Sequence, residues 1–255
     1  MVAIAARDLL VLRRDWKSTV TFSFFFPLAF LGLFGGLIGE NLGAGLPFSF
    51  LQFALVGMAA CMMAQYTMMN VTSLVQERET GFTQEIFVAP VSRFSIISGK
   101  ILGGSAAGLI QITPFFFVAW AFGAPLTWGL VSGILWVAPV GLVLGGAMGV
   151  LLAGIFATSP KAVDQAVIMV MFPQMFLSGA VIPISHSNGA LEVLVRLMPA
   201  TYLVDLMRAT AYRGTSVYAP LQLYAPWVDL VVLLAVSTAF FIAGTLLFAS
   251  RERSR

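Results

Sequence analysis

Charged residues are scarce in this sequence: they make up 10% of its 255 residues, whereas hydrophobic residues make up 59%. Water-soluble domains carry about 25% charged residues. At a mean hydropathy of +0.95, 14 basic and 11 acidic side chains are too few to solvate a chain of this size. A water-soluble globule is therefore excluded, and so is a disordered chain, which needs low hydrophobicity. The composition is typical of a multi-spanning membrane protein.

Cysteine and histidine occur once each, as Cys61 and His186. These counts exclude an internal disulfide and a metal site built from several histidines. The sequence also lacks a phosphate-binding loop, because Gly99-Lys100 has no upstream glycine at the required spacing. An intramembrane protease with Ser178 as nucleophile would need a histidine on another helix, and His186 lies in the adjoining loop. We therefore expect no catalytic residue, no metal site and no bound cofactor in this chain.

Long uncharged segments indicate six transmembrane helices. A helix needs about 20 mostly apolar residues to cross the hydrocarbon layer, and the gaps between charged residues supply six such segments. Only helices satisfy their backbone groups in lipid without the alternating pattern of strands. We predict an all-α membrane protein with a single domain over residues 1–255. Its predicted spans are 18–39, 51–75, 101–122, 128–157, 165–184 and 228–250.

The Lys and Arg residues fix the predicted orientation, since cytoplasmic loops are enriched in both. With a cytoplasmic N-terminus, eleven of the 14 basic residues fall on the inner side. The outer side then holds only Arg196, Arg208 and Arg213. Both termini are predicted to be cytoplasmic.

Residues 1–17 are predicted to form a helix that lies on the cytoplasmic membrane surface. Apolar residues recur there at helical spacing, and charged residues occupy the other side. The apolar set is Val2, Ala6, Leu9, Leu12 and Trp16, and the polar set is Arg7, Asp8, Arg14 and Asp15. The alternative is a solvated tail.

The inner loop 76–100 mixes acidic and apolar residues. Glu77, Glu79 and Glu85 lie close to Phe82 and Ile86, which share a face at i, i+4 spacing. Such a short amphipathic helix can dock into a groove on another protein. The alternative is a helix that only rests among the lipid headgroups.

The longest outer segment, 185–227, predicts two short helices separated by Pro199. The first, 190–198, carries Glu192 and Arg196 as an i, i+4 pair. The second, 201–212, carries Asp205 and Arg208. Capping of the bundle and contact with a transported molecule are both open interpretations.

Polar residues inside the spans cluster on single helix faces: Tyr66, Asn70 and Ser73 in the second span, Gln111 and Thr113 in the third, and Gln174 and Ser178 in the fifth. They can line a pathway or form hydrogen bonds between helices, and both interpretations stay open. No ionisable residue falls in the middle of a span, which argues against a carrier coupled to protons or sodium.

Two further patterns concern helix packing. Gly141, Gly145 and Gly149 recur every four residues and predict a seam of close helix contact. Methionines cluster in the second span, where they can form a soft surface for bulky amphipathic molecules or simply fill gaps. These are Met58, Met62, Met63, Met68 and Met69.

Three short motifs occur in order along the chain. They are Glu77-Arg78-Glu79-x-Gly81 with Pro90-Val91-Ser92 and Gly99-Lys100, then Phe176-Leu177-Ser178-Gly179 with Pro183, then Pro199-x-Thr201-Tyr202-Leu203 with Asp205 and Arg208. In these motifs, and over essentially its whole length, the sequence resembles the type-2 ATP-binding-cassette exporter permeases. It departs from many of them at Phe82-Thr83-Gln84-Glu85, where they have Thr-Leu-Glu, but the acid is retained.

The resemblance implies that residues 77–90 form a coupling helix docked on a separate ATPase subunit, which binds ATP and Mg²⁺. The expected docking residues are Glu77, Arg78, Glu79, Gly81, Phe82, Glu85 and Ile86. It further implies a homodimer with two ATPase copies in the inner or plasma membrane of a bacterium or archaeon. The implied role is multidrug efflux and antibiotic resistance, with no nucleic-acid partner.

The resemblance also implies a pathway between two permease subunits, lined by the second and fifth spans. The pathway and gate candidates are Met62, Tyr66, Asn70, Ser73, Phe172, Gln174, Phe176 and Ser178. Re-entrant outer helices over 185–212 would help to close the outer gate, with Glu192, Arg196, Tyr202, Asp205 and Arg208 as their polar residues. Two other functions are compatible with the residues: a channel or facilitator without an energy source, and a membrane scaffold.

Overall fold

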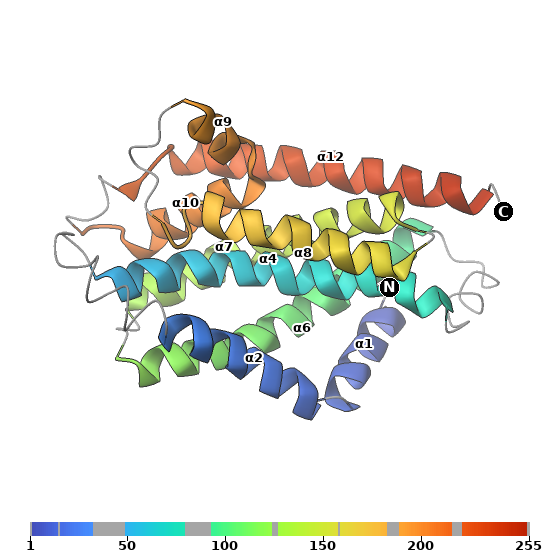
Figure 1. Cartoon of the computed structure of the whole chain (residues 1–255), viewed down its shortest axis with the longest axis horizontal. Coiled ribbons are helices and arrows are strands. Elements are labelled where there is room, and N and C mark those ends of the chain that lie inside the picture. Colours follow the sequence, from blue (N-terminus) through green and yellow to red (C-terminus); the bar gives the residue numbers. More distant parts are fainter. Residues whose placement is uncertain are drawn as a thin grey trace.

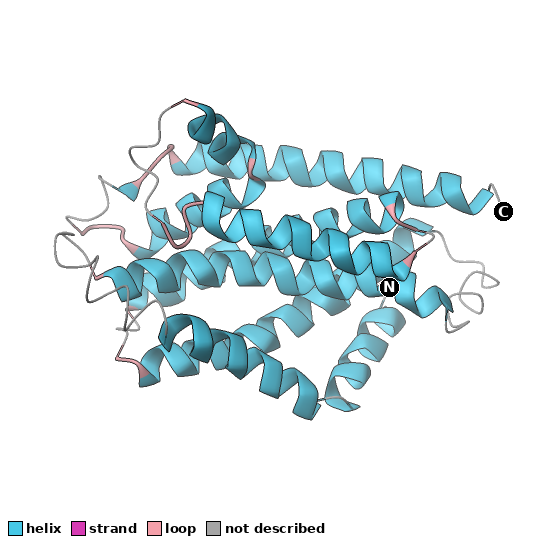
Figure 2. Ribbon diagram, in the orientation of Figure 1, coloured by secondary structure: helices cyan, strands magenta, loops and turns pink. Residues whose placement is uncertain are grey.

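The computed structural model describes residues 2–14, 16–32, 49–79, 93–123, 127–157, 159–182, 189–215 and 221–253. Within these residues the regular elements are all helices (Figure 2), which confirms the predicted all-α class. In chain order they are α1 (Val2–Arg14), α2 (Trp16–Leu31), α4 (Phe50–Glu79), α6 (Arg93–Ala121), α7 (Trp128–Ile155), α8 (Pro160–Leu177), α9 (Ala190–Leu197), α10 (Pro199–Ala211) and α12 (Pro226–Arg253).

Within the described ranges, four helices are long and apolar enough to cross a membrane: α4, α6, α7 and α12. They coincide with the predicted spans 51–75, 101–122, 128–157 and 228–250. The predicted spans 18–39 and 165–184 coincide in part with α2 and α8, which do not meet the same criteria of length and hydropathy. The total of six spans therefore stays a prediction.

Three helix boundaries near the predicted loops differ from the predicted ones. The span predicted over 165–184 ends as a helix at Leu177, because Gly179 adopts a φ of +77° that terminates helices. The helices α4 and α6 extend into the predicted loop 76–100, as far as Glu79 and from Arg93. Residues 80–92 of that loop, which contain most of the predicted coupling helix, lie outside the described residues.

The helix α4 is the centre of the bundle (Figure 1) and packs against α6, α7, α8 and α10. Its most apolar window is 83% buried, whereas that of α12 is only 22% buried. A helix whose apolar side chains are exposed suits contact with lipid, and α12 presents Val231, Leu234 and Leu246 in this way. Most of α4 therefore lies inside the bundle, whereas its polar residues Tyr66, Asn70 and Ser73 are only partly buried.

The predicted glycine seam is confirmed, and it lets α7 approach its neighbours closely. A Cβ added at Gly145 would collide with the backbone of Ala64 in α4, and one at Gly149 would lie 2.8 Å from the carbonyl oxygen of Met68. A Cβ at Gly141 would meet Leu203 of α10 at 3.2 Å. The seam thus fixes α7 against both α4 and α10.

We expect Gly145→Ala to lower the free energy of unfolding by about 2 kcal/mol, because the added methyl group has no space beside the α4 backbone. The matched control is Gly32→Ala, where the nearest atom to an added Cβ is 3.6 Å away. Gly to Ala normally stabilises a helix slightly. Thermal unfolding in detergent or nanodiscs compares the two variants, and equal stabilities would contradict the seam.

Candidate functional site

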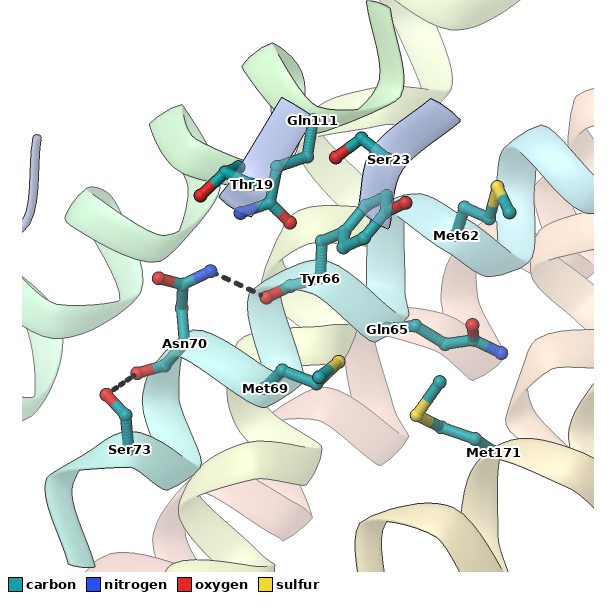
Figure 3. A pocket seen from close by; sticks show the side chains of 10 residues that line it. All are labelled: Thr19, Ser23, Met62, Gln65, Tyr66, Met69, Asn70, Ser73, Gln111 and Met171. Atoms are coloured by element: carbon teal, nitrogen blue, oxygen red, sulfur yellow. Dashed lines mark hydrogen bonds between the residues drawn. The ribbon is translucent and has the colours of Figure 1, made fainter. Parts of the chain in front are cut away.

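A cavity of about 440 Å³ lies among α2, α4, α6 and α8. The four pathway candidates of the second predicted span, Met62, Tyr66, Asn70 and Ser73, all line it (Figure 3). Six other residues complete the lining: Thr19, Ser23, Gln65, Met69, Gln111 and Met171. The four pathway candidates in α4 therefore line a single cavity.

Local hydrogen bonds hold this face of α4. The Asn70 Nδ2 group donates to the carbonyl oxygen of Tyr66 at 3.0 Å, and the Ser73 hydroxyl donates to that of Asn70 at 2.7 Å (Figure 3). The spacing i, i+4, i+7 places the three side chains on one side of the helix. Their direction therefore follows from the sequence of α4 alone.

The methionine cluster of α4 divides between the two predicted roles. Met58, Met63 and Met68 are buried in the hydrophobic core, where they fill space. Met62 and Met69 line the cavity. Gap filling is therefore confirmed for the buried methionines, whereas contact of Met62 and Met69 with a transported molecule stays a prediction.

The fifth-span candidates do not join this cavity. Phe172 is exposed, and Phe176 packs against the core. The Gln174 amide contacts the Met148 sulfur at 3.8 Å beside a different cavity, between α7 and α8. Ser178 is buried, with its hydroxyl 3.6 Å from the Cys61 sulfur. Of α8, only Met171, which the sequence analysis did not single out, lines the α4 cavity.

A second cavity of about 480 Å³ adjoins the first, since both are lined by Thr19, Asn70, Ser73 and Gln111. It reaches four charged residues, Arg7, Asp8, Glu77 and Lys100, which we call the ion cluster. Sulfur, aromatic and amide groups thus line the first cavity, and fully charged groups line the adjoining one.

The ion cluster joins three helices through short contacts. The Lys100 ammonium donates to Glu77 Oε1 at 2.7 Å and to Asp8 Oδ1 at 3.0 Å. The Arg7 guanidinium donates to Glu77 Oε2 at 2.8 Å. The side chains of Lys100 and Asp8 are only 3% and 5% exposed. Two opposite pairs balance one another, which is the arrangement that buried charges require.

The burial of Asp8 corrects its predicted place on the solvent-facing side of the first helix. It faces Lys100 of α6, whereas the apolar Leu10 of the same helix is 63% exposed. Burial raises the pKa of the Asp8 carboxyl above its usual range, and the Lys100 ammonium opposes that rise. The α1 helix is therefore attached to the bundle by charge as well as by apolar contact.

The ion cluster lies where α4 leads into the predicted coupling loop and α6 leads out of it. The predicted docking residues are placed as follows: Glu77 is in the ion cluster, Arg78 and Glu79 end α4, and Gly81, Phe82, Glu85 and Ile86 lie outside the described residues.

The two short helices predicted in segment 185–227 exist as α9 and α10, and Glu192 and Arg196 form the predicted ion pair. The Tyr202 hydroxyl donates to the carbonyl oxygen of Arg196 at 2.9 Å, and its ring stacks on that of Tyr224. The re-entrant depth of these helices stays a prediction.

Asp205 and Arg208 of α10 are both buried. The Asp205 carboxylate accepts hydrogen bonds from the backbone amides of Leu223 and Tyr224 at 3.0 and 2.7 Å. The Arg208 guanidinium donates to the carbonyl oxygen of Gly179 at 2.7 Å. Burial lowers the pKa of Arg208 to about 10, so it remains charged at neutral pH. These contacts favour the capping interpretation, because the charges of α10 bind backbone of this chain.

Comparison with known proteins agrees with this architecture. The family model described as "ABC-2 type transporter" matches residues 1–212. The chain is 27% identical over 179 residues to the inner membrane transport permease YhhJ of Escherichia coli (strain K12), covering 69% of this chain and 46% of YhhJ. It is 26% identical over 212 residues to the inner membrane transport permease YadH of the same strain, covering 81% of this chain and 80% of YadH.

A third relative is the probable doxorubicin resistance ABC transporter permease protein DrrC of Mycobacterium tuberculosis (strain ATCC 25618 / H37Rv). It is 25% identical over 142 residues, which cover 55% of this chain and 51% of DrrC. The chain thus matches about half the length of YhhJ and of DrrC. Because the family model covers most of the sequence, the chain belongs to the ABC-2 type transporter family.

Proposed function

We propose that the chain is the transmembrane subunit of an ATP-driven exporter of hydrophobic or amphipathic molecules. A separate ABC ATPase supplies the energy, and two copies of each subunit form the complex. The name of DrrC, which refers to doxorubicin resistance, supports a drug-like or natural-product cargo.

The observation that carries the proposal is the place of the ion cluster. It joins α1, α4 and α6 at the two helix ends that flank the coupling loop. It also borders the cavity, since Ser73 donates to Glu77 Oε1 at 3.3 Å and lines both cavities. A movement of the coupling loop is therefore transmitted to the cavity through the buried ion pairs of the ion cluster.

In the proposed cycle, ATP binding brings the two ATPase subunits together and moves the coupling loops. The ion pair between Lys100 and Glu77 joins α6 to α4, and the pair between Lys100 and Asp8 joins α6 to α1. The three helices therefore move together in this cycle. The glycine seam then transmits the motion of α4 to α7. The permease halves alternate between inward and outward access, and the chain itself contributes no chemistry.

Docking of the ATPase is tested with the double variant Phe82→Asp, Ile86→Asp, in the predicted apolar face of the coupling helix. Each lost apolar contact costs about 1.5–3 kcal/mol, so we expect ATPase affinity to fall by about 100-fold or more. The control is Gln84→Asp, which adds one negative charge on the opposite face of that helix. Co-purification with the ATPase measures binding, and retained binding and ATPase stimulation in the double variant would contradict the docking mode.

A facilitator without an energy source gives a different result in proteoliposomes. That function requires downhill flux of amphipathic cargo through the chain alone. An exporter subunit requires the ATPase and ATP for net transport. Flux measured with and without the ATPase separates the two.

A further inference from the structure

Several polar side chains at the joined cavities have unused hydrogen-bonding capacity. Within the described part of the chain, the amides of Gln65 and Gln111 and the hydroxyl of Thr19 make no hydrogen bond. Figure 3 shows Thr19 and the Gln111 amide converging beside Tyr66. Polar groups removed from water cost free energy unless they are paired. The donors and acceptors of these groups are therefore available to a ligand in the cavity.

The second cavity is bordered by another unpaired acceptor. Asp8 lines the second cavity, and its Oδ2 atom is buried with no hydrogen-bond partner among the described residues. Its Oδ1 atom is already engaged by Lys100. Because Oδ2 is buried, a ligand in the cavity does not reach it, and the polar part of a ligand pairs with the amides and the hydroxyl instead.

The charges at the site disfavour an ionic ligand head. The first cavity has no ionisable Asp, Glu, Lys or Arg in its lining. The ion cluster contains two cations and two anions in close pairs, so it offers no net attraction to either sign. A charged head would lose its hydration without gaining a counter-ion.

The remaining wall is soft and apolar. Met62, Met69 and Met171 approach the cavity from α4 and α8, beside the ring of Tyr66. Thioethers adapt to irregular apolar shapes. Volumes of about 440 and 480 Å³ fall within the range of small-molecule sites, about 300–1,000 Å³.

We infer that the joined cavities bind an amphiphile whose polar part is uncharged and rich in hydroxyl or carbonyl groups, such as a glycoside. The polar part lies beside Gln111 and Thr19, and the apolar part lies along the three methionines. The site is formed within one copy of the chain. That this amphiphile is the exported cargo rests on the proposed function, whereas its binding does not.

The binding test uses the full chain alone in nanodiscs. The probes are decyl glucoside, decyltrimethylammonium and decyl phosphate, which share one alkyl chain and differ in the head. We expect the glucoside to bind at least about tenfold more tightly than either charged probe, because only its head pairs with the amides without desolvating a charge. Equal binding of all three, or tighter binding of a charged probe, overturns the inference.

The matched variants are Gln111→Leu, which removes the cavity amide, and Gln165→Leu, which makes the same change at an exposed position of α8. Glucoside affinity should fall about tenfold in the first variant and stay unchanged in the second. An unchanged affinity in Gln111→Leu overturns the inference. If that variant does not fold, the ranking of the three probes on the unmodified chain still decides.

A separate arm adds the ATPase and measures probe-stimulated ATP hydrolysis. Selective glucoside binding without stimulation supports the site and contradicts the exporter proposal. Stimulation by a charged probe, without selective glucoside binding, supports the exporter and overturns the site. The two failures are therefore distinguishable.

Discussion

Replacing Lys100 by methionine is expected to lower the free energy of unfolding by about 3 kcal/mol, the typical cost of breaking a buried ion pair. Methionine preserves much of the volume but leaves the carboxylates of Asp8 and Glu77 without their shared cation. Arg7 compensates only in part, because its side chain is 30% exposed and it contacts Asp8 at 3.7 Å. We also expect the ATPase to remain bound but to lose stimulation by cargo, since α1, α4 and α6 no longer move together.

The control for this variant is Lys161→Met, at an exposed position of α8. Thermal unfolding and cargo-stimulated ATP hydrolysis are measured for both. The double variant Asp8→Asn, Lys100→Met removes one of the facing carboxylates and should recover part of the lost stability, as coupled neighbours do. Identical behaviour of Lys100→Met and Lys161→Met would refute the role of the ion cluster.

We expect the variant Arg208→Met, at the other end of the bundle, to lower the free energy of unfolding by a similar amount. It leaves the carbonyl oxygens of Gly179 and Ala180 without their donor, at about 1–3 kcal/mol for each buried group. The guanidinium also lies 3.7 Å from the ring centre of Phe53, so packing against α4 is lost as well. We expect a loss of about 3 kcal/mol and looser attachment of α10 to the end of α8.

The matched change is Arg213→Met, at an exposed position just after α10. Hydrogen exchange of α9 and α10, together with thermal unfolding, compares the two variants. Faster exchange confined to Arg208→Met is the expected result. Equal exchange in both variants would show that Arg208 does not fasten these helices.

The α4 side of the cavity could be predicted from the sequence because it depends on one helix. Tyr66, Asn70 and Ser73 share a face through helical spacing alone. Thr19 and Gln111 come from α2 and α6, and their place opposite that face depends on how the helices pack. Gln111 could be recognised as a candidate because it is one of few polar residues in its predicted span. Nothing in the sequence, however, indicates that it lies close to Tyr66.

The sequence does not show which charged residues are buried, and the prediction for Asp8 was wrong for this reason. Asp8 belongs to an amphipathic pattern that predicts exposure, yet it pairs with Lys100, more than 90 positions away. Arg208 counts as an outer positive charge, yet it is buried against the end of α8. Both pairings are long-range contacts, which no local periodicity encodes. The one available signal was that these charges adjoin the ends of apolar segments, where pairing between helices is common.

The α8 candidates were grouped with α4 because the resemblance implies a pathway between two permease subunits. In the single chain, Ser178 and Gln174 face the core and a different cavity instead. Exposed Phe172 lies on the other side of the helix. Their role in a pathway between two copies remains a prediction about the dimer.

The central claim is that this chain is a passive gate moved by a separate ATPase. Its most direct test is ATP hydrolysis and uphill export in proteoliposomes that contain the chain alone, the ATPase alone, or both. We predict cargo-stimulated hydrolysis and uphill export only with both subunits present. Hydrolysis or uphill export by the purified chain alone would contradict the claim.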